Sequence, residues 1–333
     1  MIFITINLIS FGFYRELPFC MKRILTIVLL LFITIIIIGL IPFNKQVVVK
    51  INASYFNCYQ QLGKAESWEK WNPDINKVVS NDSLLCKLNN TSKGFKLTIP
   101  NGYFDVKMQY SGNILVKRVI NGNDFNYSYI IIPGANVLTT NVIATFKSSV
   151  IKYFILALEK DDLRKTAILD FKKYMEDTKS FYGYVITSAL LKERKVIVNR
   201  KTVLKKQIYT ETSALQNQLH NYILSKQLIQ AGQVMVQYIP KAGDSIQITI
   251  GIPVNKKITT DNGFLYMQIP PTKVLLTDFK GKYSEKQKAF AAMGRYIQDR
   301  YLHGMSSPDE VFISNLPVSD DSEVEFRLMY PIL

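Results

Sequence analysis

The second half of the chain carries the same order of elements twice, and this duplication limits its fold more than any other feature. Each copy opens with a Gly-aromatic segment and continues with a strand, a long helix and two further strands. In the first copy these are Gly183–Ile186, Val196–Val203, Thr210–Ile229, Val234–Ile239 and Ile246–Ile252. In the second they are Gly263–Tyr266, Val274–Lys280, Ser284–Leu302, Val311–Asn315 and Val324–Tyr330. A repeat of this kind indicates one structural module used twice, so we expect residues 180–333 to form a duplicated β-α-β-β domain.

The strand that closes each copy alternates between two kinds of side chain. In the first, Ile246, Ile248, Ile250 and Ile252 share one face, while Gln247, Thr249 and Gly251 share the other. In the second, Val324, Phe326, Leu328 and Tyr330 lie opposite Glu323, Glu325, Arg327 and Met329. Because successive side chains of a strand point to opposite faces, the apolar faces should pack on the helices. The other faces should look onto a groove or solvent.

Four short segments of this half match a known family: Ile269-Pro270-Pro271, Phe279–Tyr283, Glu310–Pro317 and Arg327–Ile332. Together with the duplication, they resemble the GyrI-like small-molecule-binding domain, the effector-binding module of multidrug-responsive transcription regulators. The resemblance implies two repeats around a pseudo-two-fold axis, with the ligand in the groove between them among aromatics and buried acids. It also implies that Glu310 and Tyr283 flank this groove and that Thr249 holds the matching place in the first copy.

Two residues depart from the family pattern. The family usually has an acid four residues before its terminal Pro and reads cationic ligands there, whereas this chain has Arg327. An unpaired buried Arg beside an organic cation is strongly unfavourable, so we expect neutral or anionic amphiphiles instead. Arg327 either pairs with Glu325, meets an anionic ligand or is exposed to solvent. Phe312 stands where the family has Tyr, which removes one hydroxyl from the groove.

The N-terminal part contains a run of 20 residues without charge, from Ile24 to Phe43. As a helix with a rise of about 1.5 Å per residue, it reaches about 30 Å, the thickness of a bilayer core. Met21-Lys22-Arg23 precedes it, and basic residues mark the cytoplasmic side. The run is longer than a signal-peptide core of about 7–15 residues and ends without a cleavage site.

From this run we expect an uncleaved transmembrane anchor at residues 21–43, crossing a bacterial inner membrane once. The rest of the chain then lies in the periplasm or outside the cell. Because Met21 followed by Lys-Arg looks like a natural start, we regard residues 1–20 as an over-extended beginning of the chain.

Residues 44–179 predict an antiparallel sheet with helices at its start and end. The expected strands include Gln46–Ile51, Tyr103–Tyr110, Phe125–Ile132 and Val137–Phe146, and the expected helices are Tyr55–Leu62 and Ser148–Glu176. Turn signals such as Asn101-Gly102 and Asn121-Gly122 separate the strands. Pro73 should end the segment that contains Trp68 and Trp71.

Three segments of this part carry a second resemblance: Val49–Ser54, Trp68–Pro73 and Leu169–Glu176. They resemble the START-like helix-grip fold of the SRPBCC superfamily, which includes polyketide cyclase-like proteins. The resemblance implies a sheet wrapped on a long C-terminal helix, often around a cavity for an apolar ligand. Some members are cyclases or hydrolases, so the fold alone does not select a function. The whole chain is therefore expected to be an α+β protein.

Two pairs of residues in this part have alternative interpretations. Trp68 and Trp71 lie either at a cavity mouth or, as we favour, at a packing corner between helix and sheet. Cys58 and Cys86 either form a disulfide, which an exported domain permits, or, as we favour, serve as small buried hydrophobic residues.

The net charge of +15 invites a nucleic-acid interpretation, but its distribution argues against one. Residues 44–189 carry 19 basic and 12 acidic side chains, and residues 190–333 carry 19 and 13, so the excess is spread evenly. Lys outnumbers Arg 32 to 9, whereas base reading favours Arg. No segment has the character of a DNA recognition helix. We expect a solvated basic surface and no nucleic-acid partner.

Three cysteines and two histidines argue against a zinc site and against Ser-His-Asp or Cys-His catalysis. We therefore expect no metal and no cofactor. The leading hypothesis is a membrane-anchored protein that senses or sequesters an amphipathic small molecule at Glu325, Arg327, Glu310, Tyr283, Phe312 and Thr249. The first alternative, which the GyrI-like resemblance implies, is a hydrolase of a reactive amphiphile, with Glu310, Glu325 and Tyr283 as acid, base and positioning group. The second is a scaffold for a protein partner.

Overall fold

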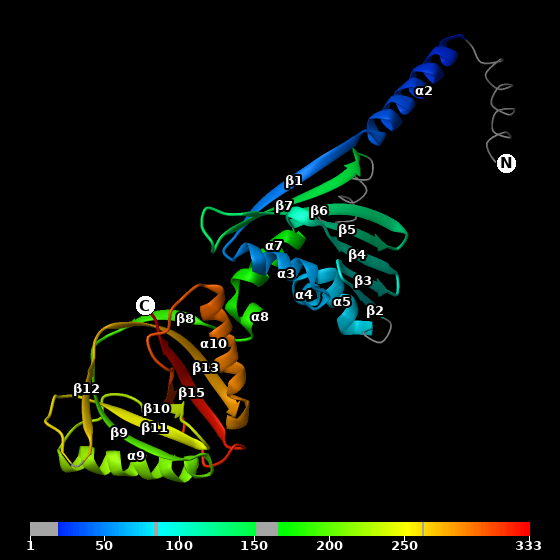
Figure 1. The fold of residues 1–333 in the computed structure, drawn as a ribbon. Coiled ribbons are helices and arrows are strands. Elements are labelled where there is room, and N and C mark those ends of the chain that lie inside the picture. Colours follow the sequence, from blue (N-terminus) through cyan, green and yellow to red (C-terminus); the bar gives the residue numbers. More distant parts are fainter. Residues whose placement is uncertain (1–18, 83–85, 151–165, 262) are drawn as a thin grey trace. The chain divides into compact units, whose positions relative to one another are not determined.

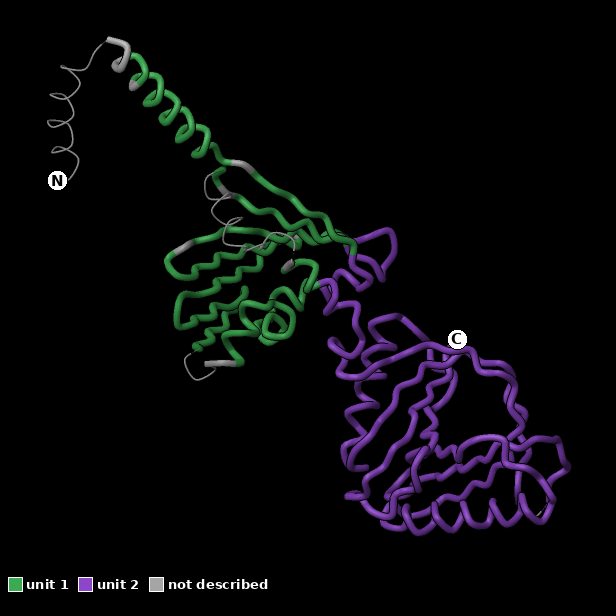
Figure 2. The backbone as a smooth tube through the Cα atoms, turned by 180° about the vertical axis from the view of Figure 1, so that it is seen from behind, with its two compact units in different colours: residues 1–50, 59–132, 141–171 green, residues 51–58, 133–140, 172–333 purple. Residues whose placement is uncertain are grey.

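The computed structural model describes residues 19–82, 86–150, 166–261 and 263–333 (Figure 1). The chain separates into two compact units, which Figure 2 colours separately. Unit 1 takes in residues 1–50, 59–132 and 141–171, as far as they are described, and unit 2 takes in residues 51–58, 133–140 and 172–333. The expected domains 44–179 and 180–333 stay a prediction. The expected over-extension at residues 1–20 falls almost entirely outside the described residues.

The apolar run forms helix α2, Phe19–Leu40, which is followed by strand β1, Pro42–Ile51. Among the described residues, no helix combines the length and hydropathy needed to cross a membrane. The expected span to Phe43 is cut short because Pro42 and Phe43 belong to β1. The 17 helical residues from Ile24 to Leu40 reach about 25 Å, against a bilayer core of about 30 Å. The transmembrane anchor stays a prediction.

Unit 1 is built on a seven-stranded sheet with the order β1-β7-β6-β5-β4-β3-β2. Strands β2 to β6 pair antiparallel with their neighbours in sequence, which confirms the predicted meander. The five strands are Lys87–Thr91, Gly94–Ile99, Gly102–Met108, Asn113–Ile120 and Asn123–Pro133, and β7 is Thr140–Ser149.

The helices beside this sheet are α3 (Tyr55–Gly63), α4 (Ala65–Trp71), α5 (Pro73–Asp82) and α7 (Thr166–Glu176). Pro73 ends α4 as predicted, but it also opens α5, because the first turn of a helix tolerates Pro. The Asn72 side chain caps α5 by accepting hydrogen bonds from the N–H groups of Asp74 and Ile75, at 3.1 and 3.2 Å.

The long helix predicted at Ser148–Glu176 is only partly comparable with the structure. Its C-terminal part is α7, while residues 151–165 lie outside the described residues. Ser148 and Ser149 belong to strand β7, so the prediction began the helix too early.

The two tryptophans lie in the core of unit 1, which confirms the packing-corner interpretation. Trp68 is completely buried, and its indole N–H donates to the Leu62 carbonyl at 2.8 Å. Its ring centroid lies 5.8 Å from that of Phe95 on β3. Trp71 packs edge-on against Phe171 of α7, with ring centroids 5.1 Å apart. The pair thus joins α4 to the sheet and to α7.

Cys58 is a free thiol, so it forms no disulfide with Cys86, as the favoured interpretation expected. Cys58 is fully buried, as expected of a small hydrophobic residue, whereas Cys86 is half-buried. Burial raises the pKa of Cys58 to about 12. A thiol with so high a pKa stays protonated at neutral pH and is a poor nucleophile.

Unit 2 contains an eight-stranded sheet with the order β12-β9-β11-β10-β14-β15-β13-β8. The first copy supplies β9 (Arg194–Leu204), α9 (Ile208–Ser225), β10 (Met235–Pro240) and β11 (Ser245–Val254). The second supplies β13 (Thr272–Lys282), α10 (Gln287–Asp299), β14 (Asp309–Phe312) and β15 (Glu323–Pro331). The duplication is therefore present, and the two copies join where β10 pairs with β14.

The opening strands of the two copies are exchanged. β8 (Thr187–Leu191) precedes the first copy but pairs with β13 of the second. β12 (Leu265–Ile269) precedes the second copy but pairs with β9 of the first. Each copy therefore pairs with the edge strand that opens the other copy. A sequence repeat records which elements exist and carries no information on strand pairing.

The strand alternation in unit 2 is as predicted. Helix α9 packs on β9 and β11, and α10 packs on β13 (Figure 1). On these covered faces Ile248, Ile250, Phe326 and Leu328 are fully buried. The short helix α8 (Thr178–Tyr182) contacts α10, and the Tyr182 hydroxyl donates to Asp299 at 3.0 Å. The face of the sheet that carries the helices and the opposite face each have a cavity.

Candidate functional site

The first cavity lies on the helix-covered face of unit 2, where α9 and α10 begin. We call it the helix-side pocket; it has a volume of about 410 Å³ and is lined in part by Tyr209, Tyr238, Tyr283, Lys286 and Glu310. Strand parity explains the position of Glu310, because β14 buries its second and fourth residues, Glu310 and Phe312. Tyr283 and Lys286 come from the turn that leads into α10.

A buried ion pair forms the polar centre of this pocket. The Lys286 Nζ lies 2.6 Å from Glu310 Oε1, and the two side chains are only 14% and 3% exposed. The Tyr283 hydroxyl donates to the other carboxylate oxygen, Oε2, at 2.9 Å. Lys286 also hydrogen-bonds the Tyr283 hydroxyl. The three side chains therefore satisfy one another in a site that water reaches poorly.

Aromatic rings surround the ammonium group. The Lys286 Nζ lies 3.9 Å from the ring centroid of Tyr283, 4.8 Å from that of Tyr238 and 5.7 Å from that of Phe290. Such distances are within the range of cation–π attraction. Tyr209 packs edge-on against Tyr283 at 6.1 Å and donates a hydrogen bond to Asp320. The chain thus provides its own cation inside an aromatic pocket.

Burial shifts the protonation equilibria of this cluster. It raises the pKa of Glu310 and lowers the pKa of Lys286, and each shift is opposed by the charge of the partner. Each charge therefore stabilises the other against the cost of burial. Burial and the nearby Glu310 carboxylate raise the pKa of Tyr283 far above its ordinary value, so its hydroxyl stays a donor. Clusters of shifted pKa values in a cavity are typical of functional sites.

The second cavity lies on the opposite face of the same sheet. We call it the open-face groove; its volume is about 350 Å³, and its lining includes Arg194, Thr249, Met267, Asp309 and Met329. On each strand, these residues alternate with the residues that face the helices, so they lie on the other face of the sheet. Thr249, for example, lies between the buried Ile248 and Ile250 of β11. The polar faces predicted to look away from the helices do so.

The structure divides the six site residues predicted from sequence among different surfaces. Tyr283, Glu310 and Phe312 lie together on the helix-covered face, and the rings of Tyr283 and Phe312 are 6.4 Å apart. Thr249 lines the open-face groove on the other side of the sheet. Glu325 and Arg327 lie in neither cavity. Whether any of the six binds a ligand stays a prediction.

Arg327 has a different partner from the one considered in the sequence analysis. Its Nε and Nη2 atoms donate to the two carboxylate oxygens of Asp278, at 2.6 and 3.1 Å. Asp278 is the residue directly opposite Arg327 on the neighbouring strand, and such cross-strand pairs lie closer than residues two apart on one strand. Glu325 pairs instead with Lys280, at 3.3 Å. Both pairs are largely exposed.

Sequence reasoning missed several residues of both cavities. Lys286 follows Tyr283 by three positions, a spacing that places two side chains on the same side of a helical turn, so this signal was available. Tyr209 and Tyr238 come from the first copy, and no sequence pattern near them indicates that they lie close to Glu310 of the second copy. Arg194 and Asp309 line the groove because of the alternation of β9 and β14, whereas the sequence predictions concerned only the closing strand of each copy.

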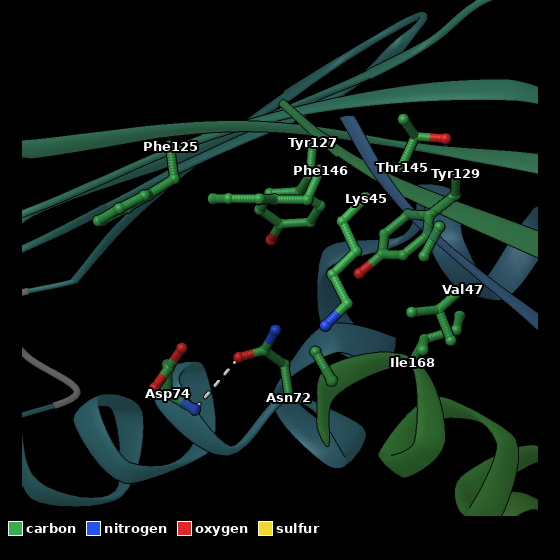
Figure 3. Close-up of a pocket in the computed structure, with 12 residues that line it drawn as sticks. Lys45, Val47, Asn72, Asp74, Phe125, Tyr127, Tyr129, Thr145, Phe146 and Ile168 are labelled. Carbon is green, nitrogen blue, oxygen red and sulfur yellow. Dashed lines mark hydrogen bonds between the residues drawn. The ribbon is translucent and has the colours of Figure 1, made fainter. Parts of the chain in front are cut away.

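Unit 1 also contains a cavity, between its sheet and helices, but a small one. Figure 3 shows Tyr127 and Tyr129 projecting from the sheet toward Asn72 and Asp74, with Lys45 extending between the two sides. The volume is about 40 Å³, enough for ordered water, since one water needs about 10–15 Å³. Ligand pockets are about 300–1,000 Å³. Within its described residues, the cavity therefore does not fit the apolar ligand that the START-like resemblance implied.

No known family model matches the sequence, and no curated protein matches it. The similar solved structures include the C-terminal domain of EcmrR, with 15% identity, a TM-score of 0.39 and coverage of 45% of this chain and 98% of that one. SAV2435 bound to tetraphenylphosphonium has 10% identity, a TM-score of 0.30 and coverage of 44% and 93%.

A START superfamily protein from Mycobacterium smegmatis is also similar, with 13% identity, a TM-score of 0.28 and coverage of 40% of this chain and 97% of that one. All three TM-scores are below 0.5. The proposals that follow therefore rest on the residues and geometry of this chain.

Proposed function

We propose that the protein binds an amphipathic small molecule in the helix-side pocket of unit 2. The observation that carries this proposal is the buried Lys286–Glu310 ion pair, which lines a cavity of about 410 Å³. Burying two charges costs their hydration energy. For this reason, a protein in which a buried ion pair is replaced by well-packed apolar residues is often equally stable or more stable. Folding alone does not require the pair. A concave site with a few convergent polar groups among aromatic rings is typical of ligand pockets.

The pair also restricts the chemistry of the ligand. Lys286 neutralises Glu310 and already contacts the three rings that would attract an organic cation. A second cation would meet this ammonium and be repelled. We infer a neutral amphiphile whose hydroxyl or carbonyl group hydrogen-bonds at the ion pair. Its apolar part would lie against Ile208 and Phe290.

The test is to extract and identify by mass spectrometry whatever small molecule co-purifies with the full-length protein. We expect one compound in near-stoichiometric amount from the wild type and its loss from Lys286→Met. Lys288→Met is the matched control, because Lys288 is an exposed lysine of the same helix that pairs with Glu285. Equal recovery from Lys286→Met, or no compound in the wild type, would contradict the proposal.

A hydrolase is the second candidate function, and one observation favours it. Glu310, with a raised pKa, and Lys286, with a lowered pKa, share hydrogen bonds with the Tyr283 hydroxyl. Groups whose pKa values are shifted toward neutrality suit general acid–base catalysis. Incubating the extracted compound with fresh protein separates the two functions. A binding protein leaves its mass unchanged, whereas a hydrolase adds water to it, and Glu310→Gln abolishes that change.

We also propose that α2 attaches the chain to a bacterial inner membrane, with both units on the periplasmic side. Support comes from the sequence, which has no charge between Ile24 and Phe43, and from the exposed apolar side chains of α2, such as Ile35 and Leu40. A helix that is apolar all round is typical of a membrane environment. A helix shorter than the bilayer core is accommodated by local thinning, at modest cost.

A further inference from the structure

The open-face groove is lined by side chains that suit a flexible apolar chain. Met235, Met267, Met305 and Met329 all line it, which is four of the nine methionines in the protein. Methionine is unbranched and polarisable, so it adapts to ligands without a rigid shape. None of the described residues that line the groove is aromatic. The groove therefore offers no stacking surface for a nucleobase or a planar dye.

The backbone keeps the floor of the groove open. Gly251 lies on β11 at the next same-face position after Thr249, where a side chain would point into the groove. A Cβ atom there would come within 2.9 Å of Val196 Cγ1 on the neighbouring strand. Glycine thus leaves room between Val196 and Thr249 that any larger residue would fill.

The charged groups of the groove have an excess of positive charge. Arg194 and Arg200 line it from the same face of β9, with Val196 and Val198 between them, and Lys192 adds a third cation. Within the described part of the chain, neither arginine forms an ion pair. Arg194 donates a long hydrogen bond to the Met329 sulfur, 3.9 Å from Nη1, and its charge acts to lower the pKa of Asp309.

The acid that lines the groove does not balance these cations. Asp309 is partly buried and accepts a hydrogen bond from Gln237, and burial raises its pKa to about 7. Among the described residues that line the groove, one carboxyl group therefore stands against three cations. The guanidinium groups are left with donors to spare, and a guanidinium binds a carboxylate through two parallel hydrogen bonds.

We propose that the open-face groove is a second binding site, for an amphipathic anion with a single alkyl chain and a carboxylate head. Arg194 and Arg200 lie six residues apart on β9, about 20 Å along an extended strand, so the carboxylate binds one of the two. The alkyl chain lies along the methionines. An organic cation is excluded by the two arginines. This site is separate from the helix-side pocket, so the proposal does not rest on the function proposed above. The cavity volume of about 350 Å³ lies within the usual range of about 300–1,000 Å³.

The test uses a photoreactive diazirine analogue of dodecanoate and the purified full-length protein. After irradiation, mass spectrometry maps the labelled residues. We expect labels at Met235, Met267 or Met329, and competition by dodecanoate but not by dodecanol or dodecylamine. The double variant Arg194→Gln, Arg200→Gln should lower labelling at these positions about tenfold, as the loss of charge-assisted hydrogen bonds implies. Arg327→Gln, an arginine of the same sheet outside the groove, should leave labelling unchanged.

A second variant covers the case in which the double arginine variant fails to fold. Thr249→Phe fills the groove without changing a charge, and it should abolish labelling while the melting temperature shows a folded chain. Labels confined to residues outside the groove, equal competition by dodecanol, or full labelling of Thr249→Phe would each overturn the proposal. Labelling is read at residues of the open-face groove, whereas the proposed function is tested at Lys286 in the helix-side pocket, so the two binding proposals fail independently.

Discussion

Lys286 Nζ lies 2.6 Å from Glu310 Oε1 although the two residues are 24 positions apart in the sequence. The contact joins the start of α10 to β14, in the middle of the sheet of unit 2. There β14 of the second copy pairs with β10 of the first. Each charge is stable there only because the other is present.

This dependence gives a stability prediction. Lys286→Met leaves the Glu310 carboxylate buried without its cation and should lower the free energy of unfolding by about 3 kcal/mol. The double variant Lys286→Met, Glu310→Gln should be less destabilised than the sum of the single variants. Urea titrations of the four proteins measure this coupling. Lys288→Met should change stability by at most about 0.5 kcal/mol, because surface charges contribute little. Strictly additive effects would contradict a buried, mutually dependent pair.

Asp309 gives a prediction on pH. Its pKa rises from 3.8 to about 7 on folding because the carboxyl group is buried. Between about pH 4 and pH 7 the folded chain therefore binds one more proton at this site than the unfolded chain, so this contribution to stability falls as the pH rises. Asp309→Asn should remove this pH dependence. The melting temperature of the variant, relative to that of the wild type, should therefore rise from pH 5 to pH 8. A constant difference across this range would show that Asp309 has an ordinary pKa.

Arg327 and Asp278 form an exposed bidentate pair, with 47% and 59% of their side chains accessible. Because exposed ion pairs are worth about 0–1 kcal/mol, Arg327→Ala should cost less than about 1 kcal/mol of stability. A thermal double-mutant cycle should show coupling of Arg327→Ala with Asp278→Ala and simple additivity with Glu325→Ala. Coupling to Glu325 alone would favour the pair first considered from the sequence.

The proposed membrane attachment predicts the accessibility of both units. A protease added to spheroplasts should digest residues 44–333, because the basic Met21-Lys22-Arg23 segment would hold the N-terminus in the cytoplasm. A cytoplasmic marker protein, which should remain intact, controls for lysis. Full protection of residues 44–333, or their release as a soluble protein, would be incompatible with the attachment.

The two expected domains should fold independently, and the chain provides a convenient probe. Both of its tryptophans, Trp68 and Trp71, are buried in unit 1. Tryptophan fluorescence of residues 44–179 and circular dichroism of residues 180–333 should each follow one cooperative unfolding transition. An unfolded or aggregated product from either segment would place the domain boundary elsewhere than residue 180.

Local sequence patterns were sufficient to predict most of the helices and strands. The isoleucines of β11 alternate with polar residues, and this alternation correctly predicted which face packs on the helices. Pro73 correctly marked the end of α4. The apolar run correctly predicted a helix at α2, but not where it ends, since Pro42 and Phe43 join β1 through pairing that no local pattern announces.

The candidate site shows the same division. By itself, the sequence determined the duplicated elements, the face on which each side chain of a strand lies, and Glu310 and Tyr283 as residues of interest. Only the tertiary structure decided that β8 and β12 are exchanged between the repeats, that Lys286 meets Glu310, and that Arg327 pairs with Asp278 rather than Glu325. The physical reason is that side-chain direction follows from periods of 2 and 3.6 residues along the chain. Partners come from strand pairing and helix docking, which bring together residues that are far apart in the sequence.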